Sequence, residues 1–540
     1  MKKYTVGCMA MLAALISMLV YLRSVGCDFV NLDDPLFILN NRFIRKMDAE
    51  FFSWAFAKSL DFWLPLTWLS FAVDYHFWGV NPKGYHLTNT LLHAANTGLV
   101  VLIADRLLGE RRATWELAAG SGFLYPLIIL FAGLLFGIHP LRVESVVWAT
   151  ERKDVLNGLF SLGSIFSYLR YAQTRVAGGE ERGARSSYLL SFALMLLSLM
   201  AKPISVVLPA MFLVADWYPL ERFRSSRALS LFVEKTPFFL LSLAISILTI
   251  SFGEEKQILI SYAQLPLSLR LIVSGNAVFE YCRLMLLPVG IIPFNVIPDG
   301  IPMAFAVKTV MVVFFSACCL YAVRSRSWLA ATWIAFIIPL LPVLGFIQNG
   351  DQAFASRYTY LPSVVPSIAA AGLFATVCTK SGVLKQRFGR ELVVSVTVMV
   401  LGIYAVTTLR LVDVWQNTET LWSRVIEFQP LGRAYSDRGI YRMLHGNSVG
   451  AVADFSAAIE IAKVARPSMV YNLYAFRGVA LRDVGRYEEA IRDLNSAIGL
   501  HPHPTYYYYR GLILRTLGRT RDAEDDFNRA GPNPPPIDWF

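Results

Sequence analysis

The sequence predicts an all-α protein, in which a polytopic bundle of membrane-spanning helices precedes a C-terminal solenoid of helix pairs. Of its 540 residues, 55% are hydrophobic and only 16% are charged, whereas soluble domains average about 45–50% apolar and about 25% charged residues. The apolar residues gather in long blocks, and the C-terminal part of the chain repeats itself. We expect the bundle over residues 1–411 and the solenoid over residues 412–540.

About eleven apolar segments approach the length of roughly 17–25 residues with which a helix crosses a bilayer. The first follows Met1-Lys2-Lys3 and lacks a small-residue cleavage site behind it, so we expect an uncleaved span. The fifth and sixth are short and are split by Lys202-Pro203, which fits either two crossings or a tight hairpin. The predicted spans are 5–22, 87–107, 121–138, 154–171, 188–200, 203–217, 237–252, 306–323, 328–347, 361–378 and 391–410.

Lys and Arg cluster in short loops between these spans, and by the positive-inside rule those loops face the cytoplasm. The rule also explains the net charge of +11 without nucleic acid as a partner. It holds only if Leu267–Leu287, which carries Arg270, Asn276 and Glu280, does not cross; we expect an amphipathic helix on the outer face. The outer face then receives the C-terminal domain and the segments of about 23–86, 139–153, 253–305 and 348–360.

The C-terminal domain repeats three times. Its units share an Arg-Gly pair and two alanines, with a second interval of 33 residues (523 minus 490) and a first of 39 (490 minus 451), which indicates an insertion near Arg466-Pro467. Helix pairs of about 34 residues with Gly at the turn are typical of tetratricopeptide (TPR) arrays. The recurring positions are Arg438-Gly439, Arg477-Gly478 and Arg510-Gly511; Ala451, Ala490 and Ala523; and Ala458, Ala497 and Ala530.

An acidic pair lies just past the first span, in Asn31-Leu32-Asp33-Asp34-Pro35. Paired carboxylates at a membrane surface suit general-base work, because repulsion and partial desolvation raise one pKa while the other group stays ionised. The alternative is an Asx turn completed by Pro35, which is the more common explanation of an isolated Asp-Asp-Pro.

A second charged segment follows the third span and runs from His139 through Glu144 to Glu151-Arg152-Lys153-Asp154. Such a density of charge beside an apolar span points to a functional surface. The alternative is an amphipathic helix whose Arg and Lys side chains snorkel to the interface.

A third segment leads from Gln348-Asn349 to Arg357-Tyr358 at the outer boundary. Arg357 can bind a lipid phosphate in a bidentate manner, or it can anchor an interfacial aromatic belt.

Further polar side chains lie at the start of a predicted span or in the turn between two spans. His86, Asn89 and His93 recur at helical spacing, and capping or inter-helix hydrogen bonds explain them better than metal ligation. Lys202 can neutralise a phosphate or simply mark a span boundary. No residue set has convincing metal-ligand spacing; the sequence therefore predicts no cofactor, although assistance by a divalent metal stays open.

In this order, the segments resemble those of the transmembrane-and-TPR O-mannosyltransferase family and its bacterial relatives, within the GT-C glycosyltransferases. The resemblance covers essentially the whole chain and depends on the combination of motifs. One departure is Lys202-Pro203, where animal members tend to have Lys-Glu; it matches the bacterial branch and weakens the case for mannose. The matching stretches are Asn31–Asn41, 64–70, 84–93, His139–Asp154, Ala201-Lys202-Pro203 with 216–220, and Arg357–Pro362.

The resemblance implies a polyprenyl-phosphate sugar donor and a hydroxyl acceptor, on a protein or a glycan held by the TPR domain, at the outer face of a bacterial inner membrane. It implies a catalytic carboxylate at Asp34 or Asp33, with Asp34 preferred because it immediately precedes Pro35, and a second acidic residue at Glu144. By chemistry rather than by a firm motif, the donor phosphate is assigned to Arg152, Lys153, Lys202 and Arg357. Further site candidates are His139, His86 and Tyr358.

Three other interpretations compete. A TPR array is first of all a peptide-binding surface, so the protein can be a membrane-anchored scaffold, although eleven spans exceed what an anchor needs. A transporter is disfavoured by the lack of inverted repeats and of charges in mid-span. A GT-C ligase that transfers a whole glycan would have the same sequence features as a transferase of single sugars.

Overall fold

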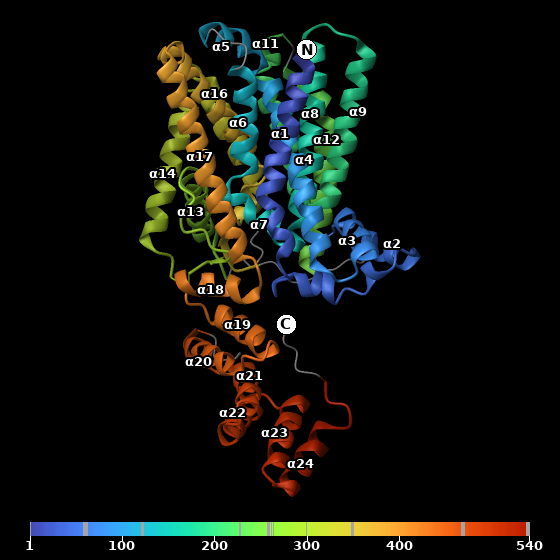
Figure 1. Ribbon diagram of the computed structural model, residues 1–540. Coiled ribbons are helices and arrows are strands. Elements are labelled where there is room, and N and C mark those ends of the chain that lie inside the picture. The colour runs from blue at the N-terminus through green and yellow to red at the C-terminus, as the bar shows by residue number, and fades with distance from the viewer. Residues whose placement is uncertain are drawn as a thin grey trace. The chain divides into compact units, whose positions relative to one another are not determined.

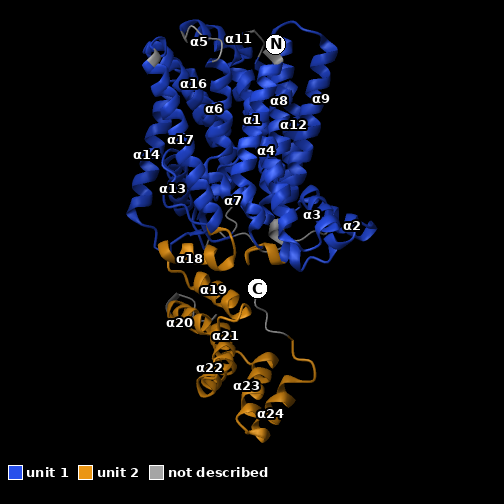
Figure 2. Ribbon diagram, in the orientation of Figure 1, with its two compact units in different colours: residues 1–28, 36–413 blue, residues 29–35, 414–540 orange. Residues whose placement is uncertain are grey.

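The computed structural model describes residues 2–57, 63–119, 124–225, 228–255, 260, 262, 264–298, 300–346, 350–465 and 470–535 (Figure 1). The chain divides into two compact units: unit 1 comprises residues 1–28 and 36–413, and unit 2 comprises 29–35 and 414–540 (Figure 2). The sequence predicts a single boundary at 411, whereas the structure assigns the segment that carries Asp33 and Asp34 to the C-terminal unit.

Unit 1 is built from helices, and each of the eleven predicted spans coincides with one. Helix α4 packs against α1, α6 and α8 and forms the centre of the bundle. The long helices are α1 (Lys2–Tyr21), α4 (Pro82–Leu108), α6 (Leu124–Gly137), α8 (Arg152–Val176), α9 (Glu181–Ala201), α10 (Leu208–Trp217), α12 (Ala228–Glu255), α13 (Leu267–Leu286), α14 (Met303–Tyr321), α15 (Ser327–Ile337), α16 (Val364–Lys380) and α17 (Arg387–Val414).

Shorter elements join these helices. The short α-helices are α2 (Ala49–Ala57), α3 (Pro65–Trp78), α5 (Arg112–Ala119), α7 (Val143–Val147) and α11 (Arg222–Ser225). Two short strands, β1 (Asn295–Val296) and β2 (Gln352–Phe354), pair antiparallel with Asn295 opposite Phe354. The remaining single turns of helix are η1 (Leu22–Gly26), η2 (Pro35–Leu39), η3 (Phe43–Arg45), η4 (Gly109–Arg111), η5 (Pro140–Arg142), η6 (Ala149–Glu151), η7 (Pro203–Val207), η8 (Ile338–Val343), η9 (Ser356–Thr359) and η10 (Val383–Lys385).

The described part of the chain contains six helices that are long and apolar enough to cross a bilayer, and the pair 124–137 and 140–147, bent by 49°, makes a seventh. Three further predicted spans are shorter apolar helices, Pro203–Trp217, Ser327–Val343 and Val364–Lys380. The eleventh, α8, begins with the charged residues 152–154. The protein is therefore an integral membrane protein with a helical bundle, and a count of eleven crossings stays a prediction.

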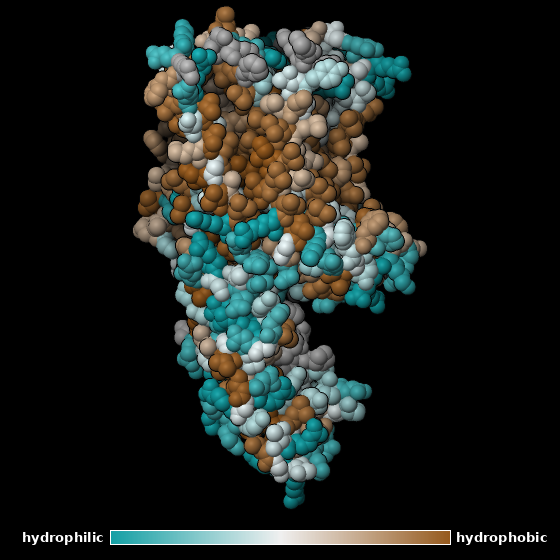
Figure 3. All heavy atoms as spheres, viewed as in Figure 1, coloured by the Kyte–Doolittle hydropathy of each residue, from teal (hydrophilic) through white to brown (hydrophobic). Residues whose placement is uncertain are grey.

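The outer surface of the bundle is apolar. In α14 and α17 only 6% of the most apolar stretch is buried, and Val310, Phe314 and Val398 expose more than half of their surface. Figure 3 shows a broad band of hydrophobic side chains on the visible face of unit 1, between more hydrophilic ends. Apolar side chains are stable in contact with lipid, because the bilayer core is itself apolar and the hydrophobic effect opposes only their exposure to water.

The two ends of the bundle carry different connecting segments. The N-terminus, α5 and α11 lie at the same end of unit 1, whereas α2 and α3 lie at the other (Figure 1). Both α5 and α11 begin with arginine. The positive-inside rule predicts that an end with basic loops faces the cytoplasm, and this orientation stays a prediction.

Helix α13 corrects one expectation. It is amphipathic, but its polar side is turned into the protein: Arg270 is 2% exposed and donates to the carbonyl oxygens of Leu265 (2.8 Å) and Phe346 (3.1 Å). The exposed residues are instead apolar, among them Leu267 and Leu271. The helix packs on α14. Backbone carbonyls thus satisfy the Arg270 guanidinium, and Glu280 on the same helix pairs with Arg283 (2.6 Å) and Lys308 (2.6 Å).

A buried ionic cluster links α8, α10, α11 and α12. The Asp216 carboxylate, which is fully buried, pairs with Lys235 and with Arg222 (3.0 Å) and accepts a hydrogen bond from Tyr168 (2.7 Å). Arg222 also pairs with Glu234 (2.8 Å). Opposite charges held together in this way compensate for the loss of hydration, and their removal one at a time leaves an uncompensated charge.

We expect Asp216→Ala to lower the free energy of unfolding of unit 1 by about 3–5 kcal/mol, because it strands Lys235 and Arg222 without their main partner. The matched control is Arg224→Ala, which breaks the exposed pair Arg224–Glu221 (2.6 Å) and should change stability by less than about 1 kcal/mol. Thermal denaturation in detergent measures both. Equal effects of the two substitutions would contradict a stabilising role for the buried cluster.

Unit 2 contains seven helices among its described residues. After α18 (Thr418–Phe428) come three antiparallel pairs, α19 (Gly432–Leu444) with α20 (Ser448–Ala465), α21 (Val470–Asp483) with α22 (Tyr487–Leu500), and α23 (Pro504–Thr516) with α24 (Thr520–Ala530). This is a TPR-like array. The insertion expected near Arg466-Pro467 and residues Gln348 and Asn349 lie outside the described residues.

The recurring Arg-Gly pair has a physical explanation. A Cβ atom on Gly439 or Gly511 would lie 2.9 Å from the ring of Phe455 or Phe527, so only glycine lets the two helices of a pair approach. Each arginine pairs with an aspartate sixteen residues later and donates to a polar side chain of the preceding helix. The pairs are Arg438–Asp454, Arg477–Asp493 and Arg510–Asp526, and the additional acceptors are Ser423, Ser456 and Asn495.

Candidate functional site

Three segments of unit 1 converge at one place. The first is the stretch from η5 through α7 and η6 to the start of α8 (140–154), the second is η9 (356–359), and the third is Lys202, between α9 and η7. The Asn89 side chain on α4 donates to the carbonyl oxygens of Val146 (3.2 Å) and Trp148 (3.2 Å) and so shapes the turn before α8. These hydrogen bonds bring residues that are far apart in sequence into one cluster.

Glu151 is the centre of this cluster. Its carboxylate oxygens lie 3.2 Å from the ammonium of Lys153, 3.3 Å from that of Lys202 and 3.3 Å from the Nε of Arg357. Lys202 also binds Asp154 (2.5 Å). We call Lys153, Lys202 and Arg357 the cation cluster.

Burial distinguishes the cations from the carboxylates. The side chains of Lys153, Lys202 and Arg357 are 10–14% exposed, whereas those of Glu144 and Glu151 are 3% and 1% exposed. Burial alone would raise the pKa of Glu151, but Lys153, Lys202 and Arg357 hold it below its usual range. The carboxylates are thus buried supports, and the cations are the groups within reach of a ligand.

Glu144 holds Arg357 from the other side. It pairs with the Arg357 guanidinium and accepts a hydrogen bond from the Arg357 backbone N–H (3.1 Å). The Nη2 of Arg357 donates to Gln352 (2.7 Å) on β2. Burial would lower the pKa of Arg357, but Tyr358, Glu144 and Glu151 raise it well above its usual value. Arg357 is therefore a fixed, permanently charged group.

Aromatic rings border the cation cluster. The Arg357 guanidinium lies 4.8 Å from the ring centre of Tyr358 and 5.5 Å from that of Trp148. The Lys153 ammonium lies 5.0 Å from the ring of Phe37. Cation–π contacts of this kind help to keep the charged groups oriented.

Arg152 lies apart from the cation cluster. Its guanidinium is completely buried and binds Asp74 (2.6 Å), Asn89 and the carbonyl oxygen of Tyr85 (2.9 Å). This saturated environment leaves no room for a phosphate. The expectation that Arg152 contacts the donor is corrected: it joins α8 to α3 and α4.

The histidine candidates have structural surroundings. His139 accepts from the backbone N–H of Leu141 through Nδ1 (3.2 Å) and donates through Nε2 to the carbonyl oxygen of Met285 (3.0 Å). His86 is 1% exposed inside the bundle. His93 binds Tyr360 (2.7 Å) and the Gly137 carbonyl (2.8 Å), which confirms the inter-helix hydrogen bonds predicted for this motif. No group of three His, Cys, Asp or Glu side chains among the described residues is placed to hold a metal ion.

Asp33 and Asp34 belong to unit 2 and are described within it. Asp34 is buried, and its Oδ2 accepts a hydrogen bond from the backbone N–H of Val30 (2.8 Å). That bond runs back to a residue four positions earlier, so it differs from the Asx turn, which runs forward. Asp33 is half-buried.

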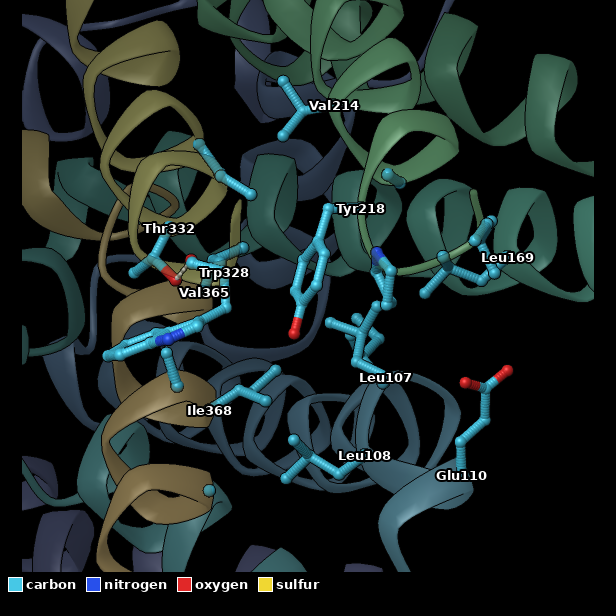
Figure 4. A pocket seen from close by; sticks show the side chains of 18 of the residues that line it. Leu107, Leu108, Glu110, Leu169, Val214, Tyr218, Trp328, Thr332, Val365 and Ile368 are labelled. Carbon is cyan, nitrogen blue, oxygen red and sulfur yellow. Dashed lines mark hydrogen bonds between the residues drawn. The ribbon is translucent and has the colours of Figure 1, made fainter. Parts of the chain in front are cut away.

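An apolar cavity of about 850 Å³ extends through unit 1. It is lined by α4, α8, α10, α15 and α16, and Figure 4 shows Tyr218 in its middle, with Trp328 and Ile368 on one side and Leu107 on the other. Its lining includes Leu361, three residues after Tyr358, and the charged residues Arg111, Arg326 and Lys380. A chain of hydrocarbon units suits such a lining.

Sequence reasoning missed Glu151 and Asp154 as members of the site. Both were noted only as part of a charged run, although their spacing of three places them on one side of the start of a helix. Their partner Lys202 is 48 residues away from Asp154. The run of charged residues 151–154 was the available signal for this site, but it did not reveal that Lys202 is their ion-pair partner.

Fold and site together define the class of this protein: a multi-span integral membrane protein with a buried, ion-paired polar site and a TPR-like unit. The chain is similar to protein O-mannosyl-transferases. A Xenopus laevis protein of that name, tmtc2, is 33% identical over 178 residues, which are 31% of this chain and 19% of the relative. Human protein O-mannosyl-transferase TMTC4 is 24% identical over 505 residues, which are 78% of this chain and 63% of the relative.

Human protein O-mannosyl-transferase TMTC2 is 32% identical over 182 residues, again 31% of this chain and 19% of the relative. The match thus spans about a fifth of both TMTC2 proteins. No family model matches the chain, and no solved structure matches it. These three relatives are protein O-mannosyl-transferases by name, and all three come from animals.

Proposed function

We propose that this protein is a glycosyltransferase that moves a sugar from a polyprenyl-phosphate donor to a hydroxyl group of a protein at the outer face of the membrane. The observation that carries the proposal is the cation cluster: three positive groups, partly exposed, supported from behind by buried carboxylates. Cationic groups held in this way can donate charge-assisted hydrogen bonds to a phosphate. The names of the relatives supply the reaction class.

The apolar cavity supports a lipid-linked donor rather than a soluble sugar nucleotide. Its lining includes Leu361, three residues after Tyr358, and continues along α16. A polyprenyl chain is a ligand of the kind that such an apolar cavity accommodates. This combination of apolar channel and anion site favours the enzyme over the alternative of a membrane-anchored TPR scaffold, which needs neither.

The proposed reaction is a single displacement. The acceptor hydroxyl oxygen attacks the anomeric carbon, the bond from that carbon to the phosphate oxygen breaks, and polyprenyl phosphate leaves with its negative charge held by Lys153, Lys202 and Arg357. Asp34 takes the proton of the hydroxyl. One displacement inverts the anomeric configuration, whereas a covalent intermediate would retain it. The role of Asp34, with Asp33 beside it, rests on the resemblance.

We further propose that the TPR-like unit binds the acceptor protein. A solenoid presents an extended surface that suits a peptide, and partly exposed Tyr507, Tyr508 and Tyr509 on α23 supply aromatic contacts. Tyr506, the first of this tyrosine run, is buried and donates to Asn472 (2.6 Å), so it belongs to the core of the unit.

The decisive test is sugar transfer by the purified full-length protein in liposomes. Synthetic polyprenyl-phosphate mannose and other polyprenyl-phosphate sugars are offered with a library of Ser- and Thr-containing peptides, and products are detected by mass. We expect transfer from at least one lipid-linked donor and none from nucleotide sugars. Transfer from nucleotide sugars alone would contradict the donor class, and no transfer from any donor would favour the scaffold.

The orientation of the protein in the membrane can be tested independently of sugar transfer. We propose an inner membrane location of bacterial type, with the N-terminus inside and the TPR-like unit outside, because the basic loops mark the inner side. In a chain without its native cysteines, Ser496→Cys on α22 should react with a membrane-impermeant maleimide in intact cells. The matched control Ser186→Cys on α9, also exposed, should react only after permeabilisation. The reverse pattern would invert the topology.

A further inference from the structure

We propose that the TPR-like unit positions the loop that carries Asp33 and Asp34, and that Asn31 is the positioning residue that fastens this loop. The inference deepens the proposed function and rests on it for the role of the two carboxylates. It concerns contacts inside unit 2, to which residues 29–35 belong (Figure 2). Neither the sequence motifs nor the relatives point to this role.

Asn31 makes three hydrogen bonds to two helices of unit 2. Its backbone N–H donates to the hydroxyl of Thr418 (3.0 Å), and its side-chain oxygen accepts from the indole N–H of Trp422 (2.8 Å), both on α18. Its side-chain NH₂ donates to the backbone carbonyl of Asp437 (3.2 Å) on α19. The loop is thereby held at the first inter-helix contact of the array.

The partners determine how the Asn31 amide is oriented. An indole N–H is only a donor and a backbone carbonyl is only an acceptor, and the Asn31 amide satisfies both because it has an acceptor oxygen and a donor NH₂. Trp422 is fully buried and Thr418 is 2% exposed. A buried donor that loses its acceptor is costly, so these partners favour a single position of Asn31.

Because Asn31 lies close to Asp33 and Asp34 in the chain, fixing Asn31 also restricts the positions of the two carboxylates. Asn31 precedes Asp33 by two residues, and Val30, its neighbour, donates its backbone N–H to Asp34 Oδ2 (2.8 Å). Residues 30–34 therefore form a closed loop whose one side is bonded to α18 and α19. In consequence, the proposed general base and the surface proposed to bind the acceptor belong to the same compact unit.

A purely structural explanation also exists: Asn31 can simply complete the core at the start of the array. The two roles differ in their kinetic effect. A positioning role lowers kcat and leaves donor binding unchanged, because the donor site is formed by residues of unit 1. A purely structural role changes thermal stability without a selective loss of kcat.

The test uses the full-length protein in nanodiscs with three variants, Asn31→Ala, Trp422→Phe and Thr418→Val. The matched control is Tyr506→Phe, which likewise removes one aromatic donor to an asparagine oxygen, that of Asn472 (2.6 Å), further along the array. Hydrogen–deuterium exchange is followed in the peptide that covers residues 28–36, and transfer kinetics are measured with a polyprenyl-phosphate sugar.

We expect exchange in residues 28–36 to accelerate about tenfold in Trp422→Phe and Thr418→Val, since one lost hydrogen bond shifts a local equilibrium by about that factor. The acceleration should be larger in Asn31→Ala, which loses two hydrogen bonds, and exchange should stay unchanged in Tyr506→Phe. The kcat of transfer should fall about 10- to 100-fold, as for other misplaced catalytic groups, with the donor KM unchanged. The control should retain wild-type kcat.

Two results would overturn the proposal. Unchanged exchange in both Asn31→Ala and Trp422→Phe would show that α18 and α19 do not hold the loop. Faster exchange with unchanged kcat would show that the loop is held but that its position does not matter for transfer. If the wild type transfers no sugar at all, the proposed function fails, and the exchange measurement still decides whether Asn31 fastens the loop.

Discussion

Replacement of Asp34 by asparagine should reduce sugar transfer by about 10²–10⁴-fold, the usual effect of losing a general base. The substitution keeps the size of the side chain, and its amide oxygen can still accept the hydrogen bond that Asp34 Oδ2 receives from Val30 (2.8 Å). The loop should therefore keep its conformation while losing its ability to take a proton. Transfer from a polyprenyl-phosphate sugar in liposomes, normalised to inserted protein, measures the loss.

The matched control for this prediction is Asp33→Asn, which changes the neighbouring and more exposed carboxylate. We expect a smaller loss, because Asp33 acts only by its charge on Asp34. Near-normal transfer by Asp34→Asn would remove Asp34 from the mechanism. A larger loss in Asp33→Asn than in Asp34→Asn would move the role of general base to Asp33.

Replacement of Arg357 by glutamine should reduce transfer by about 10²–10³-fold, the range seen when a preorganised group that stabilises developing charge is removed. The structure suggests a competing explanation, because the change also leaves Glu144 buried at 3% exposure without its main partner. The double variant Glu144→Gln/Arg357→Gln separates the two effects, since it removes both charges of the pair together.

If Arg357 holds the donor phosphate, the double variant should be folded and as inactive as Arg357→Gln alone. If Arg357 serves only to neutralise Glu144, the double variant should regain most of the activity. A binding assay with unlabelled polyprenyl phosphate as competitor provides the second measurement: affinity should fall in both variants under the first explanation and recover in the double variant under the second.

The helices of the bundle could be predicted from the sequence because the signal for them is local. A block of apolar residues of sufficient length forms a helix in a membrane whatever its neighbours are, since every backbone polar group must be satisfied inside the segment. For this reason each of the eleven predicted spans coincides with a helix. The three repeats of unit 2 could also be predicted from a local signal, because glycines and alanines at fixed intervals mark close helix contacts.

The sequence-based expectations for α13 and Arg152 were wrong because residues far away in the chain determine what their polar side chains contact. The polar residues of α13 predict an amphipathic helix, but which side faces water depends on carbonyl groups 76 residues away, at Phe346. Arg152 belongs to a charged run typical of a binding surface, yet Asp74, 78 residues earlier, holds it inside the bundle. Local patterns identify which residues are polar, and distant residues determine what they contact.

In the candidate site, too, the sequence identified the charged residues but not their contacts. The sequence singled out Lys153, Lys202, Glu144 and Arg357 one by one, as charged groups next to apolar spans. It did not show that Glu151 joins three of them, because Lys202 and Arg357 approach it from segments that are distant in the chain. The run of four charged residues at the start of α8 was compatible with both a surface helix and a paired network.

The contact between Asn31 and Trp422 has a consequence for biosynthesis, because 391 positions separate the two residues along the chain. At the usual elongation rate of about 5–20 residues per second, Asn31 is made roughly 20–80 s before Trp422. Throughout that interval the newly inserted protein lacks the helices that fasten residues 29–35. A nascent or prematurely terminated chain therefore inserts its first spans with this loop still loose, and the loop acquires its native conformation only when translation is nearly complete.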